Sequence, residues 1–569
     1  MPKQWNIHPT DLPLAESIAA QARLPLPIAR VLVQRGFHDA DGVGAFMNPR
    51  LSGLSDPFLL PDMEKAAVRL WAAIDGQESI TVFGDYDVDG VTSSALLTRI
   101  LTALGGRVRA FIPDRLDEGY GLSQDALERC LAEHGSTVVV SVDCGVNSVG
   151  SVAYAQQLGI DVIVTDHHEP EETTAPAYAL INPKLGDQPD LENLSGVGVA
   201  FKLAHALVKL GRGQGKPAAI QLELRNYLDI VALGTVADIV PLVGENRILV
   251  RHGLAQLGWT RWVGLQALKD VAGVKGEADT FQLGFQLAPR INAAGRIGQP
   301  MQALQLLVTN DAGEAQRIAK LLDDTNAERR RIEREMADEA FAEIDEYFSA
   351  GKNFGLVVAR EGWHPGVVGI VASRVARHYN RPAIIMGIEE DGSARGSCRS
   401  IDEYNLLEGL LACEVCLSKF GGHKMAAGLE VKPGELEAFK AAFNAAVAAT
   451  LGETDLSPVL HIDAEVAPEE VDWDFLEQLK RLYPFGQENP EPVWAVRRLR
   501  VSGSPRVVGQ NHLKLSLVAA GETFDAIAFN YPLENLPAGE VDVAFTLKEN
   551  QWMGNSSLQL QVQDIRASG

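Results

Sequence analysis

Residues 79–94 read SITVFGDYDVDGVTSS, an apolar, β-branched run that ends directly in an acidic loop. Short apolar runs of this kind predict buried strands, and the next run, VTSSALLTRILTALGG, has a helical pattern. The alternation continues through four more apolar runs: RVRAFI (107–112), TVVVSV (137–142), DVIVT (161–165) and YALI (178–181). Strands that alternate with amphipathic helices predict βαβ units and a buried parallel sheet.

Acidic and imidazole side chains follow three of these strands. Since the carboxyl ends of parallel strands share one edge of an open sheet, where ligands bind, we expect these groups to lie close together. Asp238, after the apolar residues of YLDIVALGTVADIVPL, is expected to join them. The groups at the strand ends are Asp85, Asp87, Asp89, Asp143, Asp166, His167 and His168.

The spacing of the first three aspartates gives an expectation about their direction. If the strand conformation persisted, Asp85, Asp87 and Asp89 would point the same way, because side chains on a strand repeat every second residue. Gly90 would then permit a sharp turn, and Thr92 or Ser93 would cap the helix that follows.

Carboxylates gathered without counter-ions repel one another strongly. Two divalent cations about 3.5–4 Å apart would relieve that repulsion and are the usual apparatus for phosphoester hydrolysis. Carboxylates with imidazole and no thiolate favour Mn²⁺, with Mg²⁺ as the second candidate, because catalytic zinc normally takes more nitrogen ligands. A single Asp after a strand is more simply a helix cap, but three clusters at one edge favour a metal centre.

The motifs D-Y-D-V-D-G (85–90), D-C-G (143–145) and D-H-H (166–168), followed by Asp238, resemble the DHH phosphoesterase superfamily in order and spacing. The resemblance implies that Asp87 and Asp143 bind one metal ion and that Asp89, Asp143, His167 and Asp238 bind the other. It implies contact with the phosphate, or help in proton transfer, for His168. Asp85 stands where several relatives carry a metal-binding histidine, and we group it with Asp166 and His168 as catalytic candidates.

A second set of candidates would bind the phosphates of a substrate. Gly421, Gly422 and His423 resemble the G-G-H signature of the DHHA1 substrate-binding domain that accompanies DHH domains. Glycines let a backbone approach phosphate closely, and a guanidinium can bind it through two hydrogen bonds. For any single arginine a surface salt bridge is the simpler interpretation. The other candidates are Arg115, Asn292, Arg296, Ser373, Arg374, Ser397 and Arg399, with Arg115 and Arg296 expected at the 5′ end.

The length of 569 residues indicates about three or four domains in an α/β multidomain protein. We expect residues 1–75 to be a helical segment of the DHH module, 76–311 the parallel-sheet DHH catalytic domain and 312–350 a long connecting helix. Residues 351–452 are assigned to a second α/β domain of the DHHA1 type. The short strands of residues 453–569 predict a β-barrel of the OB-fold type, in which Phe485, Trp494 and Phe529 are candidates for base stacking.

Composition limits the class of protein. The formal net charge of −24 opposes general nucleic-acid binding, although residues 352–424 are nearly balanced and local charge governs a groove. We find no apolar run near the length of a membrane span and no signal-peptide pattern at the start, so a cytoplasmic protein is expected. Five cysteines argue against a disulfide framework, and Cys413 and Cys416 are expected to be buried thiols.

The chain length, the joining helix and the strand-rich tail favour the RecJ-type members of the superfamily. That resemblance implies 5′→3′ hydrolysis of single-stranded DNA to 5′-mononucleotides in DNA repair and recombination. It also implies a monomer whose partners are single-stranded-DNA-binding protein and a RecQ-type helicase. Two alternatives stay open: a DHH phosphodiesterase for short RNA or cyclic dinucleotides, and a non-catalytic DNA-binding scaffold. Discrimination of DNA from RNA depends on pocket shape rather than on these motifs.

Overall fold

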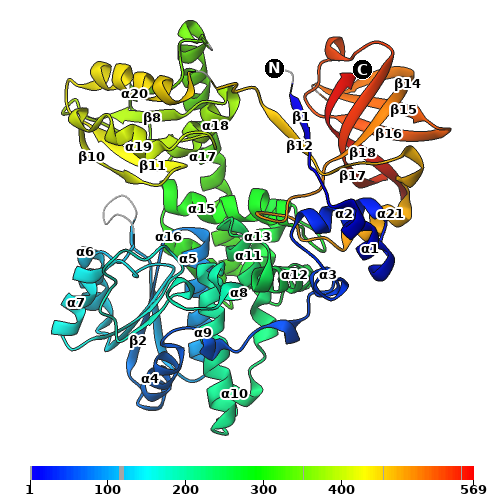
Figure 1. The fold of residues 1–569 in the computed structure, drawn as a ribbon. Coiled ribbons are helices and arrows are strands. Elements are labelled where there is room, and N and C mark those ends of the chain that lie inside the picture. Colours follow the sequence, from blue (N-terminus) through cyan, green and yellow to red (C-terminus); the bar gives the residue numbers. More distant parts are fainter. Residues whose placement is uncertain (1–2, 115–120, 350, 453, 510, 553) are drawn as a thin grey trace. The chain divides into compact units, whose positions relative to one another are not determined.

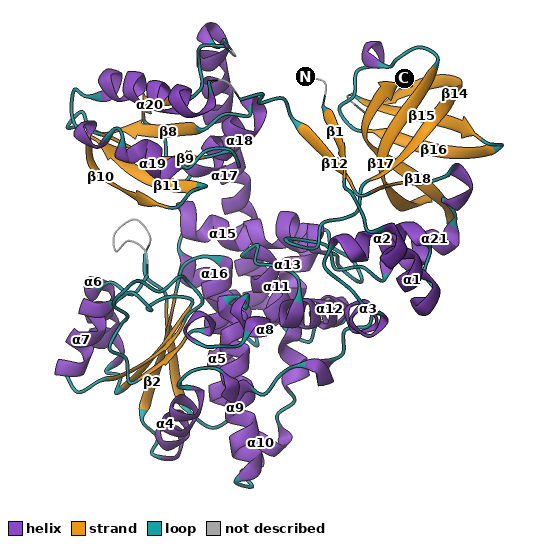
Figure 2. Cartoon of the chain, in the orientation of Figure 1, coloured by secondary structure: helices purple, strands orange, loops and turns teal. Residues whose placement is uncertain are grey.

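The computed structural model describes residues 3–114, 121–349, 351–452, 454–509, 511–552 and 554–569 (Figures 1 and 2). They form two compact units. The larger unit comprises residues 3–288, 303–316 and 459–569, and the smaller unit comprises residues 289–302 and 317–458. No helix in the described part of the chain is both long and apolar enough to cross a membrane.

A five-stranded parallel sheet forms one core of the larger unit, as the alternating pattern predicted. Its strands lie in the order β3-β2-β4-β5-β6, and every pairing is parallel. The central strand is buried along its whole length, which explains its uninterrupted apolar sequence. The strands are β2 (Ser79–Gly84), β3 (Arg107–Phe111), β4 (Val138–Val142), β5 (Asp161–Thr165) and β6 (Ala179–Ile181).

Helices cover both faces of this sheet (Figure 2). One face packs on α6 (Gln124–His134) and α7 (Val149–Gln157), whose apolar residues share a core with Phe83 and Val139. The other face packs on α5 (Val88–Ala103) and α9 (Gly196–Gly213).

A layer of helices lies outside α5 and α9. Its centre is α11 (Leu228–Ala237), in which all residues from Leu228 to Thr235 are buried. It packs against α5, α9 and α12 (Gly244–Gly258). The remaining helices of this region are α4 (Met63–Asp75), α8 (Pro189–Glu192), α10 (Pro217–Gln221), α13 (Val263–Ala272), α14 (Thr280–Gln282), the π-helix η5 (Leu283–Leu287) and α16 (Pro300–Val308), the first residues of which belong to the smaller unit.

The C-terminal part of the larger unit is a closed β-barrel, which confirms the predicted barrel. Its strands run in the order β13-β14-β15-β16-β18-β17, and a further pairing of β14 with β17 closes it. The strands are β13 (Ala464–Glu465), β14 (Trp494–Val508), β15 (His512–Ala519), β16 (Glu522–Ala528), β17 (Glu540–Trp552) and β18 (Asn555–Ala567); helix α21 (Trp473–Lys480) precedes β14.

The N-terminal segment packs with this barrel. Helices α1 (Leu12–Ala22), α2 (Leu26–Gln34) and α3 (Ala40–Met47) share one apolar core with α21 and the barrel strands. The helical pattern expected for residues 1–75 misses one strand, β1 (Gln4–Ile7), which pairs in parallel with β12 (Val459–Ile462). Four residues carry too little periodicity to predict a strand whose partner lies at the other end of the chain.

The smaller unit is a second α/β domain. Its five strands lie in the order β10-β11-β9-β8-β7; β7 and β8 are parallel, and the other pairs are antiparallel. The predicted long helix is α17 (Ala312–Tyr347), most of which belongs to this unit. The other elements are α15 (Ala288–Ile297), β7 (Leu356–Glu361), α18 (Val368–Tyr379), β8 (Ala383–Ile388), β9 (Ala394–Arg399), α19 (Leu406–Leu411), β10 (Leu417–Gly422), β11 (Ala426–Val431) and α20 (Leu436–Leu451). Cys413 and Cys416 are buried free thiols, as expected.

One buried cation ties the barrel to the helical layer of the larger unit. Arg247 on α12 is 2% exposed. Its Nε donates to Phe46 O at 2.9 Å, and its two terminal nitrogens donate to the carbonyls of residues 481–484 at 2.9–3.3 Å. Burial lowers the pKa of Arg247 to about 9. Five carbonyl dipoles, rather than a carboxylate, therefore stabilise this charge.

We expect Arg247→Met to destabilise the larger unit by about 2–4 kcal/mol, because buried carbonyls that lose their donors retain their desolvation cost. Denaturant unfolding followed by circular dichroism measures the loss. Arg251→Met is the matched control, since Arg251 is exposed and its guanidinium lies over the Tyr483 ring at 5.9 Å. Equal stability of the two variants would contradict the assignment.

Candidate metal centre

The acidic loop after β2 forms the first part of the site. The strand ends at Gly84 and helix α5 begins at Val88, so the expected continuation of the strand through Asp89 is wrong. Asp87 is the N-cap of α5 and accepts a hydrogen bond from Gly90 N at 3.0 Å, while Asp89 lies in the first turn.

Neither Thr92 nor Gly90 has the role expected from sequence. The Thr92 hydroxyl donates to Val88 O at 2.8 Å inside the helix, so it does not cap α5. Gly90 lies in the helix rather than in a turn, and a Cβ there would lie 2.4 Å from Asp85 O. The glycine thus lets the first turn of α5 lie directly on the loop that carries Asp85.

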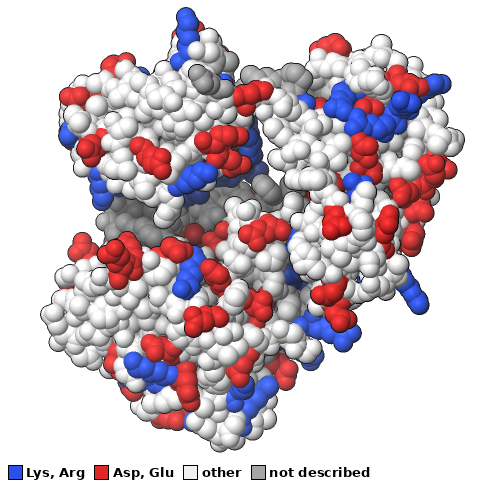
Figure 3. All heavy atoms as spheres, viewed as in Figure 1, with Lys and Arg blue, Asp and Glu red and all other residues white. Residues whose placement is uncertain are grey.

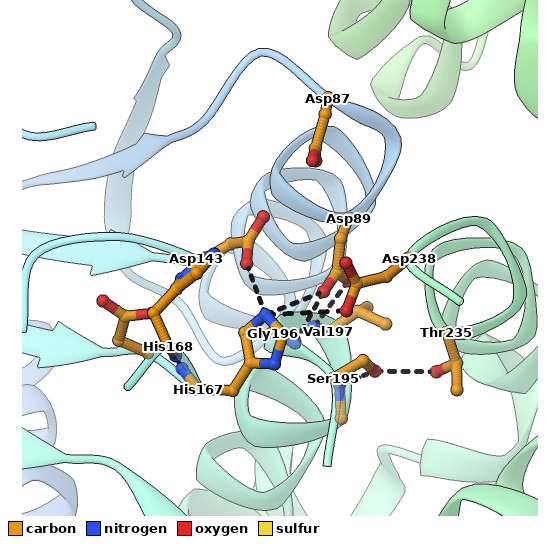
Figure 4. A network of polar contacts seen from close by, with 12 residues as sticks. Asp87, Asp89, Asp143, His167, His168, Ser195, Gly196, Val197, Thr235 and Asp238 are labelled. Carbon is orange, nitrogen blue, oxygen red and sulfur yellow. Dashed lines mark hydrogen bonds and ion pairs between the residues drawn. The ribbon is translucent and has the colours of Figure 1, made fainter. Parts of the chain in front are cut away.

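Three further segments bring their side chains to the same edge of the sheet (Figure 4). Asp143 follows β4, His167 follows β5, and Asp238 is the C-cap of α11. The Nε2 atom of His167 lies 3.2 Å from Asp143 Oδ1, 3.5 Å from Asp238 Oδ2 and 4.0 Å from Asp89 Oδ2. Groups far apart in sequence therefore converge as the strand ends predicted.

The ligand atoms form overlapping sets. Within each set, one potential ligand atom per residue lies within 4.8 Å of the others. The sets share Asp143 and His167, so they describe two adjacent positions rather than one. The sets are Asp85, Asp87 and Asp143; Asp89, His167 and Asp238; and Asp143, His167 and His168.

The chemistry of these atoms fits divalent cations. Asp143 Oδ1, Asp238 Oδ2, His167 Nε2 and both carboxylate oxygens of Asp85 are buried and have no hydrogen-bond partner among the described residues. Buried polar atoms are normally paired, because desolvation is costly. Hard oxygen ligands with one imidazole would satisfy that need by binding Mn²⁺ or Mg²⁺.

The N-terminus of α9 orients one of the carboxylates. Gly196 N and Val197 N donate to the two oxygens of Asp89 at 2.6 and 2.8 Å. Ser195, the N-cap of α9, is held by Thr235 Oγ1 at 2.8 Å. A helix N-terminus stabilises an anion through its free N–H groups and its dipole. Asp89 is thus fixed as a carboxylate facing the centre.

Two glycines that sequence reasoning missed allow this close packing. A Cβ on Gly196 would lie 2.6 Å from Asp143 Oδ1, and a Cβ on Gly234 would lie 2.2 Å from Thr92 Oγ1 and 2.9 Å from Asp89 Oδ1. Only a residue without a side chain lets α9 and α11 come so near the carboxylates. The signal in the sequence is the SGVG stretch (195–198), which opens a helix with small residues.

The clustered carboxylates hold their protons unusually tightly. Burial, followed by the charge of Asp87, raises the pKa of Asp85 to about 8 and that of Asp238 to about 7. Burial and the neighbouring aspartates also raise the pKa values of Asp89 and Asp143 well above their usual range. Burial lowers the pKa of His167 to about 3, which keeps its imidazole neutral and fit to bind a metal.

His168 and Asp166 form a separate pair. His168 Nδ1 lies 2.7 Å from Asp166 Oδ1. Burial acts to raise the pKa of Asp166, but the hydrogen bond from His168 outweighs it and lowers that pKa. Burial acts to lower the pKa of His168, and Asp166 outweighs it and raises that pKa. Asp166 also accepts from Val146 N at 2.9 Å, so it orients the imidazole rather than facing the metal positions.

Several of the predicted phosphate-binding residues meet in the smaller unit. Arg296 Nη1 donates to Gly366 O at 3.1 Å, and Arg399 Nη1 donates to Ser397 Oγ at 2.7 Å. Gly369 lies between them in the sense that a Cβ there would be 3.1 Å from both Arg399 Nη2 and Ser397 Oγ. Two arginines thus lie near the start of α18, where backbone N–H groups are available.

The other members of that set are placed differently. Arg374 pairs with Glu333 at 3.4 Å on the exposed side of α18, which is the surface salt bridge that its sequence also allowed. Ser373 donates to Gly369 O within the helix, and Asn292 is half-buried on α15. Gly421 and Gly422 end β10, and His423 N donates to Ala426 O at 2.8 Å in a hairpin. Arg115 lies outside the described residues.

Of the three aromatic candidates for base stacking, only one is well exposed. Trp494 is fully buried and packs edge-to-face on Phe475, so it belongs to the barrel core and is not available to a base. Phe485 packs against the same core. Phe529 is 48% exposed and rests edge-on against His512.

Three family models match the chain in the order of these regions. The DHH family, N-terminal domain, matches residues 79–235; the DHHA1 domain matches residues 352–449; and the RecJ OB domain matches residues 462–564. The first match contains every residue of the metal centre except Asp238.

Curated relatives align with nearly the whole chain. The single-stranded-DNA-specific exonuclease RecJ of Bacillus subtilis (strain 168) is 37% identical over 573 residues, which cover 99% of this chain and 71% of that protein. The protein of the same name from Escherichia coli (strain K12) is 36% identical, with 97% of both chains covered.

Solved structures agree in fold. RecJ from Thermus thermophilus in complex with Mn²⁺ covers 100% of this chain and 80% of its own, with a TM-score of 0.85 and 32% identity. The same protein in complex with Mg²⁺ gives a TM-score of 0.78 and 31% identity, with 100% of this chain and 79% of its own covered. With its motifs, domain order and full-length similarity, this chain belongs to the RecJ family within the DHH superfamily.

Proposed function

We propose that this chain is a metal-dependent exonuclease that degrades single-stranded DNA from the 5′ end to 5′-mononucleotides, in DNA repair and recombination. The observation that carries the proposal is the pair of overlapping ligand sets that share Asp143. Its relatives from Bacillus subtilis and Escherichia coli are named single-stranded-DNA-specific exonucleases. The 5′→3′ direction rests on the family resemblance.

The two alternatives are less well supported. A phosphodiesterase for short RNA or cyclic dinucleotides needs no barrel, whereas this chain carries a closed barrel that matches the RecJ OB domain. Figure 3 shows a cluster of Lys and Arg side chains over that barrel despite the acidic total, which suits contact with a phosphate backbone. A non-catalytic scaffold has no need of buried carboxylates whose oxygens lack partners.

The chain's own residues define the chemistry of the centre. Asp85, Asp87 and Asp143 would hold one cation, and Asp89, Asp143, His167 and Asp238 would hold the other. When bound, two such cations supply Lewis acidity toward a phosphoryl oxygen and activate water as a nucleophile. Asp143, which belongs to both sets, fixes their separation. Asp89 is held in place by α9.

His168 supports the reaction through its orientation. With Nδ1 hydrogen-bonded to Asp166, exchange of a proton with substrate takes place at Nε2. In the smaller unit, Arg296 and Arg399 would bind phosphate, together with the N-terminal turn of α18. These groups recognise the charge of the substrate and not its bases.

The partners and setting of the enzyme extend the same proposal. We infer a cytoplasmic monomer that acts with single-stranded-DNA-binding protein and a RecQ-type helicase. Mn²⁺ is the preferred metal, since imidazole in the ligand set favours it over Mg²⁺. Co-purification with the two proteins and sedimentation in solution test these points.

The first test is the reaction itself. With Mn²⁺, the 5′ label of single-stranded DNA is expected to appear at once as a mononucleotide, while duplex DNA and single-stranded RNA stay intact. Asp143→Ala is expected to reduce kcat by at least about 100-fold, because it removes a ligand shared by both positions, and outer-shell changes alone cost about 10–100-fold. Early release of a 3′ label instead would refute the polarity, and equal activity of the variant would refute the site.

Gly196→Ala tests the close approach of α9. The added methyl group would meet Asp143 Oδ1, so we expect the Kd for Mn²⁺ to rise at least about tenfold by isothermal titration calorimetry. Gly213→Ala, in the last turn of the same helix, is the control, because a Cβ there meets nothing within 4 Å. An unchanged Kd in Gly196→Ala would show that the contact is not needed.

The pH dependence of metal stabilisation tests the raised carboxylate pKa values. A carboxylate whose folded-state pKa is raised stabilises the metal-free fold at low pH, and that contribution is lost as pH rises through the folded pKa. With pKa values of about 7 and 8, metal-free protein should lose stability between pH 6 and 9. Mn²⁺ displaces those protons, so the increase in Tm on adding Mn²⁺ should be larger at pH 8.5 than at pH 6. A smaller increase at pH 8.5 would contradict the assignment.

A further inference from the structure

A pair of exposed aromatic rings that the fold does not require lies on the helical layer of the larger unit. In the segment 281–287, Leu283 and Leu287 are fully buried, whereas Phe281 and Phe285 are 59% and 71% exposed. The two phenyl rings stack on each other with centroids 4.8 Å apart and planes inclined by 29°. The buried leucines already anchor the segment, so packing gives no reason for large apolar groups on its outer face.

This ring pair lies next to the metal centre. A Cβ on Gly284 would be 3.9 Å from Val236 Cγ1, which places η5 against the last turn of α11. Asp238 caps that turn, and the next residue, Ile239, is 71% exposed with φ of 63°. A β-branched residue rarely adopts this conformation, and such strain is concentrated at functional sites. Exposed apolar groups therefore begin one residue after a metal-centre carboxylate.

The segment is held rigidly from its other side. Thr280 N donates to Tyr483 Oη at 2.9 Å, and Thr280 Oγ1 donates to Phe485 O at 2.8 Å. The loop at 481–484 is itself fixed by the guanidinium of Arg247. A surface that is already ordered loses little conformational entropy when a ligand binds to it.

A cation flanks the rings. The guanidinium of exposed Arg251 lies over the Tyr483 ring, and in the described part of the chain it makes no ion pair that competes for its charge. The nearby carboxylate of Asp279 is occupied in capping the helix, where it accepts from Gln282 N at 2.7 Å. Aromatic faces beside a free cation are the combination that binds the bases and phosphates of an unpaired strand.

We propose that Phe281 and Phe285 form a base-stacking platform for the single strand beside the metal centre. This inference rests on the proposed function and adds specificity-determining residues to it. Every base presents a π face, so the contact does not depend on sequence. Bases inside a duplex are stacked on one another and paired, so they cannot lie flat on the rings. The platform therefore selects single strands by the chemistry of their bases as well as by their width.

The test compares the double variant Phe281→Ala/Phe285→Ala with the wild-type chain and with Trp259→Ala. Trp259 is 82% exposed but follows α12 at the opposite end of α11 from Asp238, since a Cβ on Gly253 would lie 2.1 Å from Leu228 O. We expect the double variant to raise KM for long single-stranded DNA by roughly 5- to 100-fold with kcat little changed, because stacking contributes this much per base. Trp259→Ala should leave KM unchanged.

A strand with one abasic residue, moved stepwise from the 5′ end, locates the contact. In the wild type, KM should rise at the position that stacks, and the double variant should show no added penalty at that position. Hydrolysis of a dinucleotide is the control for an intact metal centre, because so short a substrate makes no contact beyond it, and its rate should be equal in all three proteins.

The outcomes separate the two proposals. If the wild type degrades single-stranded DNA and the double variant keeps the same KM, the platform is wrong and the exonuclease assignment stands. If the wild type degrades no single-stranded DNA, the proposed function fails and the platform fails with it. If light scattering shows that the double variant abolishes a dimer of the wild type, the rings bind a second copy of the chain, which also overturns the platform.

Discussion

The architecture of the larger unit depends on one electrostatic constraint: several carboxylates must lie within a few ångströms of each other in a buried place. Asp85, Asp89 and Asp143 are almost fully buried, and burial together with mutual repulsion raises their pKa values. In a low-dielectric interior such an arrangement is unfavourable unless protons or cations compensate it. The surrounding elements are arranged to maintain it, and bound divalent cations would stabilise it most.

The sheet, the helix termini and the glycines each contribute to that arrangement. The parallel sheet ends its strands at one edge, which places Asp143 and His167 beside each other. The N-terminus of α9 donates two hydrogen bonds to Asp89 and so offsets part of its charge. Gly196 and Gly234 allow the two helices to approach without displacing a ligand. The centre is therefore a property of packing as much as of its ligands.

The rest of the larger unit fixes the surroundings of the centre. Helices α1–α3 complete the core of the barrel, and β1 pairs with the strand that leads into it. Arg247 then joins the 481–484 loop to the helical layer, and Tyr483 in that loop holds Thr280. The exposed rings of Phe281 and Phe285 stand at the end of this chain of contacts. Barrel, helical layer and metal centre are thus connected through hydrogen bonds to backbone groups, which depend little on side-chain identity at the accepting positions.

The sequence by itself determined the parallel sheet, the long helix, the barrel and the convergence of Asp87, Asp143 and His167, because period and strand-end position are local properties that repeat along the chain. Tertiary structure alone decided that the strand stops at Gly84 and that Asp87 caps a helix, since a helix start depends on what packs against its first turn. It also decided the burial of Trp494, the pairing of β1 with β12 and the need for glycine at positions 196 and 234. Each of these follows from contacts between segments far apart in the sequence, for which no local pattern carries a signal.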